Sequence, residues 1–193
     1  MLDHDVTHNR TYRYGAAGIF PFGRGLSLTT FELAMTTSTA AAQPVTLKTD
    51  GSSNDLQVTV TVTNTGGMAG DEVVQAYLHP LDVSSLQLHP IKTLFGVSRL
   101  DNIAPAESAA YTFSINVKDL LLAAASGDLV SAPGSYRLTF ESGAEASAGD
   151  ALSLSLLLVG EQIVHDPFPA VPLPLAASVV VGQPGEAINR VLF

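Results

Sequence analysis

The chain has 193 residues, enough for one domain with extensions, and 46% of them are hydrophobic against 14% charged. This balance supports a buried core and excludes disorder throughout. The 18 acidic residues against 9 basic residues give a net charge of −9, which opposes binding to nucleic acid or to an anionic membrane. The absence of cysteine excludes disulfides, thiolate metal sites and a cysteine nucleophile.

No targeting or membrane-spanning segment is recognisable. Residues 1–5 are acidic and lack the basic-then-apolar order of a signal peptide. The most apolar runs, Ala151–Val159 and Ala170–Val181, are too short to cross a membrane. We therefore expect a soluble chain whose export signal, if there is one, lies outside it. Its abrupt start resembles an interior cut.

Residues 1–30 are predicted to form an aromatic connector arm. The stretch from Arg10 to Phe31 shows no helical period, Pro21 fixes one backbone angle, and Gly23 and Gly25 permit turns. Its large aromatic side chains need a surface to lie on, supplied either by the domain that follows or by something outside the chain. These side chains are Tyr12, Tyr14, Phe20, Phe22 and Phe31.

Residues 31–160 are predicted to form a sandwich of short strands. Apolar and polar residues alternate with a period of two over 56–63, 71–80, 91–100, 109–117, 135–141 and 151–159, whereas 36–46 has the composition of a loop. Pro80 is expected to end its strand and Gly96 to place a bulge in the next one. Asp119 is expected to cap a short helix over 119–125. The pattern predicts an all-β antiparallel sandwich.

Residues 161–193 are predicted to form an extended tail. Its prolines favour a polyproline-like backbone that runs over the surface, and Ser178–Val181 is a candidate edge strand.

Side chains that could carry chemistry do not converge. Asp71 and Glu72 are adjacent on a strand, so they point to opposite faces, and we expect them at a solvated sheet edge. His79, His89 and His165 stand at or near prolines and are predicted to pack in loops. The sequence therefore predicts no catalytic residue, no metal site and no cofactor.

Two further motifs lie near the start of the chain. His4 and His8 are four residues apart, but no helix signal supports a metal site there. Asn9 is a formal N-glycosylation acceptor, which is meaningful only if the chain is secreted.

Several motifs follow one another in order between about residues 10 and 160. They are Arg10-Thr-Tyr-Arg-Tyr14, Phe20-Pro-Phe-Gly23, Gly25-Leu-Ser27, Val58-Thr-Val-Thr-Val-Thr-Asn-Thr-Gly66, Ala69-Gly-Asp-Glu-Val-Val-Gln75, Pro90-Ile-Lys92 and Pro133-Gly-Ser-Tyr136. In these motifs and their spacing the chain resembles the C-terminal fibronectin type III-like domain of glycoside hydrolase family 3. That family includes β-glucosidases and β-xylosidases. Arg24, Leu28 and Val97 depart from the side chains usual in the family, which are an aromatic residue or His, Tyr, and Phe, respectively.

The resemblance implies a fibronectin type III/immunoglobulin-like β-sandwich that packs against and steadies upstream catalytic domains. Those domains, a barrel with a nucleophilic aspartate and an α/β domain commonly carrying the acid/base, are not in this chain. No catalytic residue matches, so the chain alone is expected to be inactive. By the same resemblance the location is secreted, vacuolar or cell wall. The predicted docking residues are Arg10, Tyr12, Arg13, Tyr14, Phe20, Phe22, Arg24 and Phe31.

Two other hypotheses stay open. The sandwich could bind carbohydrate or a cell-wall polysaccharide, although the lack of tryptophan disfavours this. The chain could also be an inactive truncated product. The sequence does not choose between a glucoside and a xyloside as the substrate of the parent enzyme.

Overall fold

The computed structural model describes residues 11–15, 19–38, 44–53, 55–86, 88–143 and 152–169. The His4 and His8 pair, Asn9, Arg10 and the candidate strand Ser178–Val181 lie outside these ranges. Within them, no helix is long and apolar enough to cross a membrane.

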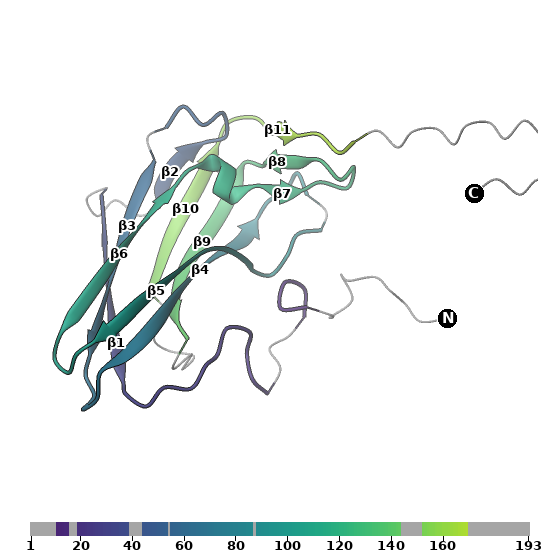
Figure 1. Cartoon of the computed structure of the whole chain (residues 1–193). Helices are drawn as coiled ribbons and strands as arrows, with labels where there is room; N and C mark the ends of the chain where they lie inside the picture. Colours follow the sequence, from purple (N-terminus) through teal and green to yellow (C-terminus); the bar gives the residue numbers. More distant parts are fainter. Residues whose placement is uncertain are drawn as a thin grey trace, which may run out of the picture.

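Two β-sheets face each other and enclose the core (Figure 1). The smaller sheet has the strand order β1 (Phe31–Thr37), β3 (Leu56–Asn64), β6 (Ser108–Ile115). The larger sheet has the order β2 (Val45–Lys48), β10 (Leu152–Val159), β9 (Gly134–Ser142), β4 (Gly70–Asp82), β5 (Thr93–Ile103). Neighbouring strands in both sheets are antiparallel except β2 and β10, which are parallel. The predicted β-sandwich is confirmed.

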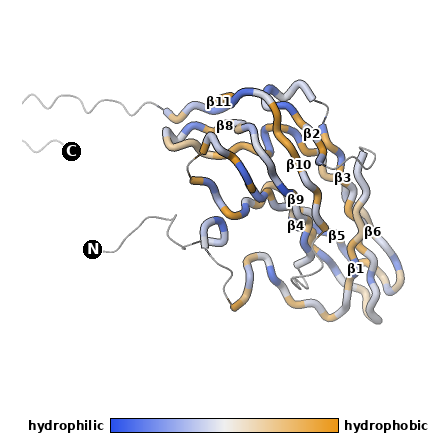
Figure 2. The backbone as a smooth tube through the Cα atoms, turned by 180° about the vertical axis from the view of Figure 1, so that it is seen from behind, coloured by the Kyte–Doolittle hydropathy of each residue, from blue (hydrophilic) through white to orange (hydrophobic). Residues whose placement is uncertain are grey.

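Alternate residues of the facing strands make the core, as the period of two predicts. Leu56, Val58, Val60 and Val62 of β3 are buried, whereas the residues between them are partly exposed. They face the apolar positions of β4, β9 and β10, including Phe140. Figure 2 shows the hydrophobic positions distributed along the strands of both sheets.

The predicted bulge in β5 is present. Ala76 of β4 pairs with Gly96 and Tyr77 pairs with Leu94, so Phe95 is the extra residue. A Cβ atom at Gly96 would lie 3.1 Å from the ring of Phe113, which leaves little room for a side chain.

Two boundaries were predicted wrongly. The predicted loop over 36–46 is shorter, because β1 continues to Thr37 and β2 begins at Val45. Pro80 does not end its strand, because β4 continues to Asp82. The pairing of β4 with β5 stops at Leu78, so from there on β4 is paired with β9 alone. A proline is tolerated where a strand has a free side.

A third, small sheet closes one end of the sandwich, with the order β11 (Ile163–Asp166), β8 (Leu129–Ser131), β7 (Leu122–Ala123). The short helix predicted over 119–125 is wrong in its bounds, because the chain forms the 3-10 helix η1 (Val117–Leu120) and then enters β7. The cap of η1 is Asn116 rather than Asp119. Asn116 Oδ1 accepts from the Lys118 N–H at 2.9 Å, and Asp119 Oδ2 accepts from the Asn116 N–H at 2.9 Å. The prediction was wrong because Asp119 closes the capping box from inside the turn. β11 belongs to the segment predicted as an extended tail.

Candidate docking face

The arm lies along the outer face of β4, on the side opposite to the core residues Val74, Ala76 and Leu78. Three hydrogen bonds fix its path. The Ile91 N–H donates to Arg13 O (2.5 Å), Gln75 Nε2 donates to Gly23 O (2.9 Å), and the Gly25 N–H donates to Gly143 O (2.5 Å). The arm is thus held at both ends of its crossing before it enters β1.

An aromatic cluster lies where the arm meets the sheet. The ring of Tyr12 stacks on Phe22 with centroids 4.0 Å apart, and it meets the edge of Tyr77 at 6.3 Å. The Tyr12 hydroxyl accepts from the Leu94 N–H at 3.3 Å. Tyr77 is fully buried although it points away from the core. The sandwich therefore supplies the surface that this part of the arm needs.

Tyr77 also orients the side chain that holds the arm. Its hydroxyl donates to Gln75 Oε1 at 2.5 Å, which directs the Gln75 amide nitrogen to Gly23 O. Burial, together with the nearby Glu141 and Tyr12, raises the pKa of Tyr77 to about 12. Gly23 has a φ of 88°, and a Cβ there would overlap the Gln75 amide and lie 2.8 Å from the Tyr77 hydroxyl oxygen. Only glycine fits this position without strain.

A polar network continues from Tyr77 across β9. Lys92 Nζ lies 4.0 Å from the centroid of the Tyr77 ring and 3.2 Å from Glu141 Oε2. Thr139 Oγ1 donates to Glu141 Oε1 at 3.1 Å and lies 2.9 Å from His79 Nε2. Because the single hydroxyl hydrogen of Thr139 goes to the carboxylate, His79 Nε2 is the donor to Thr139. Burial of the ring, with the cations Arg137 and Lys92, lowers the pKa of His79.

Glu72 corrects the expectation of a solvated sheet edge. As predicted, Asp71 and Glu72 point to opposite faces, and Asp71 is exposed, where it accepts from Arg99 and from the Asn102 N–H at 2.7 Å. Glu72 is buried, because β4 lies between β9 and β5, and it accepts from Ser142 Oγ and from the Gly143 N–H, both at 2.8 Å. Gly143 O in turn accepts from the Gly25 N–H, so Glu72 helps to position the arm through Gly143.

The end of the arm is fixed by a buried amide. Asn64 Oδ1 accepts from Thr29 Oγ1 at 2.8 Å and from the Gly66 N–H at 3.0 Å. Its Nδ2 donates to Met68 O and Ile103 O at 2.7 and 2.8 Å. All the hydrogen-bonding capacity of this side chain is used, and it ties the arm to the turn between β3 and β4 and to the end of β5.

The other side of the arm faces solvent. Ile19 is 92% exposed, Phe20 77%, Leu26 100% and Leu28 89%. Arg24 is exposed beside them, with its guanidinium carbon 5.9 Å from the centroid of the Phe20 ring. Val97, also exposed, pairs with Gln75 and so lies on the strand next to the arm. Apolar side chains gathered in this way typically mark an interaction surface.

The structure thus divides the predicted docking residues. Tyr12 contacts Tyr77 of the sheet and stacks on Phe22, Arg13, Tyr14 and Phe31 are half-buried, and Phe20, Phe22 and Arg24 are exposed. Sequence reasoning missed the residues that hold the arm, namely Glu72, Gln75, Lys92, Glu141 and Asn64. Their signal was present in part, because Glu72 and Gln75 belong to the Ala69–Gln75 motif. The motif alone does not say what these side chains bind.

Among the described residues, no cluster of three or more His, Asp or Glu side chains could hold a metal ion. His79 and His165 lie on β4 and β11, so the prediction that they pack in loops was wrong. His89 lies between strands, as predicted. Ser131 Oγ donates to Thr49 O at 2.8 Å and therefore accepts from His165 Nε2 at 3.0 Å, which ties β11 to β8.

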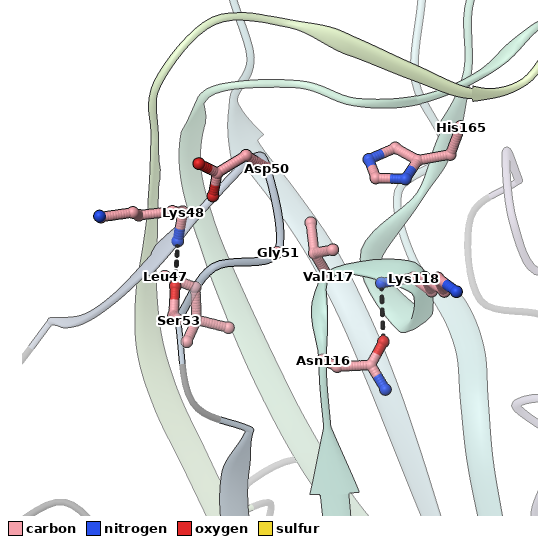
Figure 3. A pocket seen from close by; sticks show the side chains of 9 residues that line it. All are labelled: Leu47, Lys48, Asp50, Gly51, Ser53, Asn116, Val117, Lys118 and His165. Atoms are coloured by element: carbon pink, nitrogen blue, oxygen red, sulfur yellow. Dashed lines mark hydrogen bonds between the residues drawn. The ribbon is translucent and has the colours of Figure 1, made fainter.

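A pocket of about 370 Å³ lies beside η1 and His165, and no residue of the arm lines it (Figure 3). Several polar groups in its wall are bonded within the chain. Ser53 Oγ accepts from the Lys48 N–H at 2.6 Å, and Asn116 is occupied by the cap of η1. The side chains that line this pocket do not form a catalytic arrangement.

A family model described as a fibronectin type III-like domain matches residues 72–144. The chain is 32% identical over 167 residues to the probable exo-1,4-beta-xylosidase bxlB of Aspergillus oryzae. It is also 35% identical over 132 residues to the xylan 1,4-beta-xylosidase of Xylanibacter ruminicola. These matches cover 83% and 68% of this chain. The chain spans only 20% and 14% of the length of the two relatives.

Solved structures agree with these matches. β-Glucosidase 3B from Thermotoga neapolitana superimposes with a TM-score of 0.58 at 29% identity, covering 77% of this chain and 18% of that chain. A GH3 exo-beta-xylosidase (XlnD) has the same fold, with a TM-score of 0.62 at 23% identity, covering 82% of this chain and 21% of that chain. The chain carries the fibronectin type III-like domain of glycoside hydrolase family 3. In this fibronectin type III-like domain, two residues of the family motifs hold the arm: Gln75 binds Gly23 and Asn64 binds Thr29.

Proposed function

We propose that this fibronectin type III-like domain is a non-catalytic part of a family 3 glycoside hydrolase and that it docks onto the catalytic domains through the outer side of its arm. The observation that carries the proposal is the two-sidedness of the arm. One side is hydrogen-bonded and stacked on β4, while the other exposes Ile19, Phe20, Leu26 and Leu28. The much greater length of the relatives supports the presence of such domains.

Burial of the four exposed side chains would remove a large apolar area from water, which favours association. The fixed path of the arm adds to this, because a preorganised surface loses less conformational entropy when it binds. The domain would then steady the catalytic part without touching the substrate.

A chimera tests the docking role. In the Aspergillus oryzae relative, the matched region is replaced by this chain, and the product is compared with the relative shortened by the same region. We expect the chimera to retain more β-xylosidase activity after mild heating than the shortened protein. Changing Phe20 and Leu28 to Ser should remove that advantage. Equal heat resistance of all three proteins would contradict the proposal.

We propose that the parent enzyme acts on β-xylosides, because two curated relatives at 30% identity or more are named as β-xylosidases. A complete enzyme containing this chain should hydrolyse an aryl β-xyloside faster than the corresponding β-glucoside. The isolated chain should hydrolyse neither. Turnover by the isolated chain that is lost on changing a single carboxylate would contradict its non-catalytic role.

Carbohydrate binding by the domain itself gains no comparable support. Among the described residues, the exposed aromatic rings Phe20 and Phe22 belong to the arm, whereas Tyr111 belongs to β6 and Phe168 to the segment after β11, so they do not form one row on one element.

A further inference from the structure

The basic side chains of this acidic chain are gathered around the arm. The structure describes seven of them, and five lie on the arm or on the strands and loop next to it. These five are Arg13, Arg24, Lys92, Arg99 and Arg137. The other two, Lys48 and Lys118, line the pocket of Figure 3. The arm face therefore differs in charge from the rest of a molecule whose net charge is −9.

Among the described residues, two of the five cations pair with carboxylates. Lys92 pairs with Glu141 at 3.2 Å, and Arg99 pairs with Asp71 and with Asp101. Arg13, Arg24 and Arg137 have no carboxylate partner among the described residues. Arg137 is exposed on β9, where it pairs with His79 across the strands, and Arg24 is exposed beside Phe20.

A second observation concerns hydrogen bonds. In the described part of the chain, two buried side-chain polar atoms have no hydrogen-bond partner, Arg13 Nε and Thr93 Oγ1. Both lie where the arm meets the start of β5, since Arg13 O accepts from the Ile91 N–H and Tyr12 accepts from the Leu94 N–H. An arginine N–H only donates, so the group that Arg13 lacks is an acceptor. Buried donors are normally paired, so this junction is the part of the arm face where hydrogen-bonding groups most lack partners.

We propose that the surface which covers the arm is acidic, with carboxylates placed opposite Arg13, Arg24 and Arg137 around an apolar patch that receives Ile19, Phe20, Leu26 and Leu28. This inference rests on the docking role proposed above and adds the chemistry of the partner. Arginine binds carboxylates through two parallel hydrogen bonds, which fixes orientation as well as position. Charge complementarity also excludes wrong orientations, because the rest of the domain is acidic and would be repelled by the same surface.

The test uses the chimera described above, in which the whole chain replaces the matched region of the Aspergillus oryzae relative. One variant carries Arg24→Glu and Arg137→Glu, and the matched control carries Lys48→Glu and Lys118→Glu. Both variants change the net charge equally, at exposed positions. Calorimetry compares the unfolding temperature of the domain in each chimera and in each isolated chain. We expect the arginine variant to unfold about 2–4 °C below the control in the chimera, and at the same temperature when isolated.

Salt provides a second readout. The difference between the two chimeras should shrink when sodium chloride is raised from about 50 mM to about 500 mM, because the charges are then screened. Equal unfolding temperatures of the two chimeras at low salt would overturn the acidic partner. Even with equal temperatures, Phe20→Ser with Leu28→Ser could still lower the unfolding temperature of the chimera. The docking role would then stand without an acidic partner surface.

An acidic polysaccharide is the competing ligand for a basic face. Soluble polygalacturonate, titrated into the isolated chain, is therefore included. Binding that is lost in the arginine variant, together with no difference between the two chimeras, would assign the face to the polysaccharide and overturn the proposal.

Discussion

The two sides of the arm differ in how many of their stabilising contacts come from the domain itself. On the inner side, Tyr12 and Gly23 make their contacts with β4 and β5 inside this chain. On the outer side, Ile19 and Leu26 are almost entirely exposed. Substitutions on the inner side should therefore change the stability of the isolated domain. Those on the outer side should change only its association.

The largest expected difference compares Tyr77 with Phe20. Tyr77→Ala removes a fully buried aromatic side chain beneath the arm and should lower the free energy of unfolding by about 3–5 kcal/mol. Phe20→Ala removes an exposed ring and should change it by less than about 0.5 kcal/mol. Urea denaturation of both isolated variants measures the contrast. Equal losses would show that the two sides do not differ.

An intermediate effect is expected at Gly23. Gly23→Ala forces an L side chain into a left-handed conformation against Gln75, which should cost about 1–2 kcal/mol and loosen the arm. Chymotrypsin should then cleave next to Phe20 and Phe22 faster than in the parent chain. Gly67→Ala is the matched control, because a Cβ there would have no neighbour within 4 Å. Unchanged cleavage in the Gly23 variant would mean that Gln75 does not hold the arm.

The smallest expected effect is a change of the unfolding free energy with pH in the acidic range. The pKa of His79 is lowered in the folded state from its ordinary value of 6.5, so the unfolded chain binds more protons as the pH falls past that value. The contribution of His79 to stability is therefore present above pH 6.5 and is lost as the pH falls through its folded pKa. His79→Gln should flatten the curve of unfolding free energy against pH below 6.5. A parent curve that is already flat would contradict the lowered pKa.

Local patterns in the sequence were sufficient to predict the sandwich but not the arm contacts. The alternation of Leu56, Val58, Val60 and Val62 reports burial directly, because successive strand residues point to opposite faces. The hold of Gln75 on Gly23 joins a side chain to a backbone carbonyl 52 residues away, and no local period encodes such a bond. Glu72 was placed at a solvated edge because an acidic pair usually marks a surface. Its burial depends on β9 and β5, which flank it from distant parts of the chain.

β1 was not predicted as a strand, for a related reason. Its residues Phe31–Thr37 alternate, but the inward positions are only half-buried and the strand ends in threonines that resemble a loop in composition.

The central claim is that the outer side of the arm is covered by a partner while the inner side is covered by this domain. Hydroxyl-radical footprinting of the isolated chain and of the chimera tests it most directly. We expect Ile19, Phe20, Leu26 and Leu28 to be oxidised readily in the isolated chain and to be protected in the chimera, with Tyr77 protected in both. Equal oxidation of the four outer residues in the two proteins would contradict the claim.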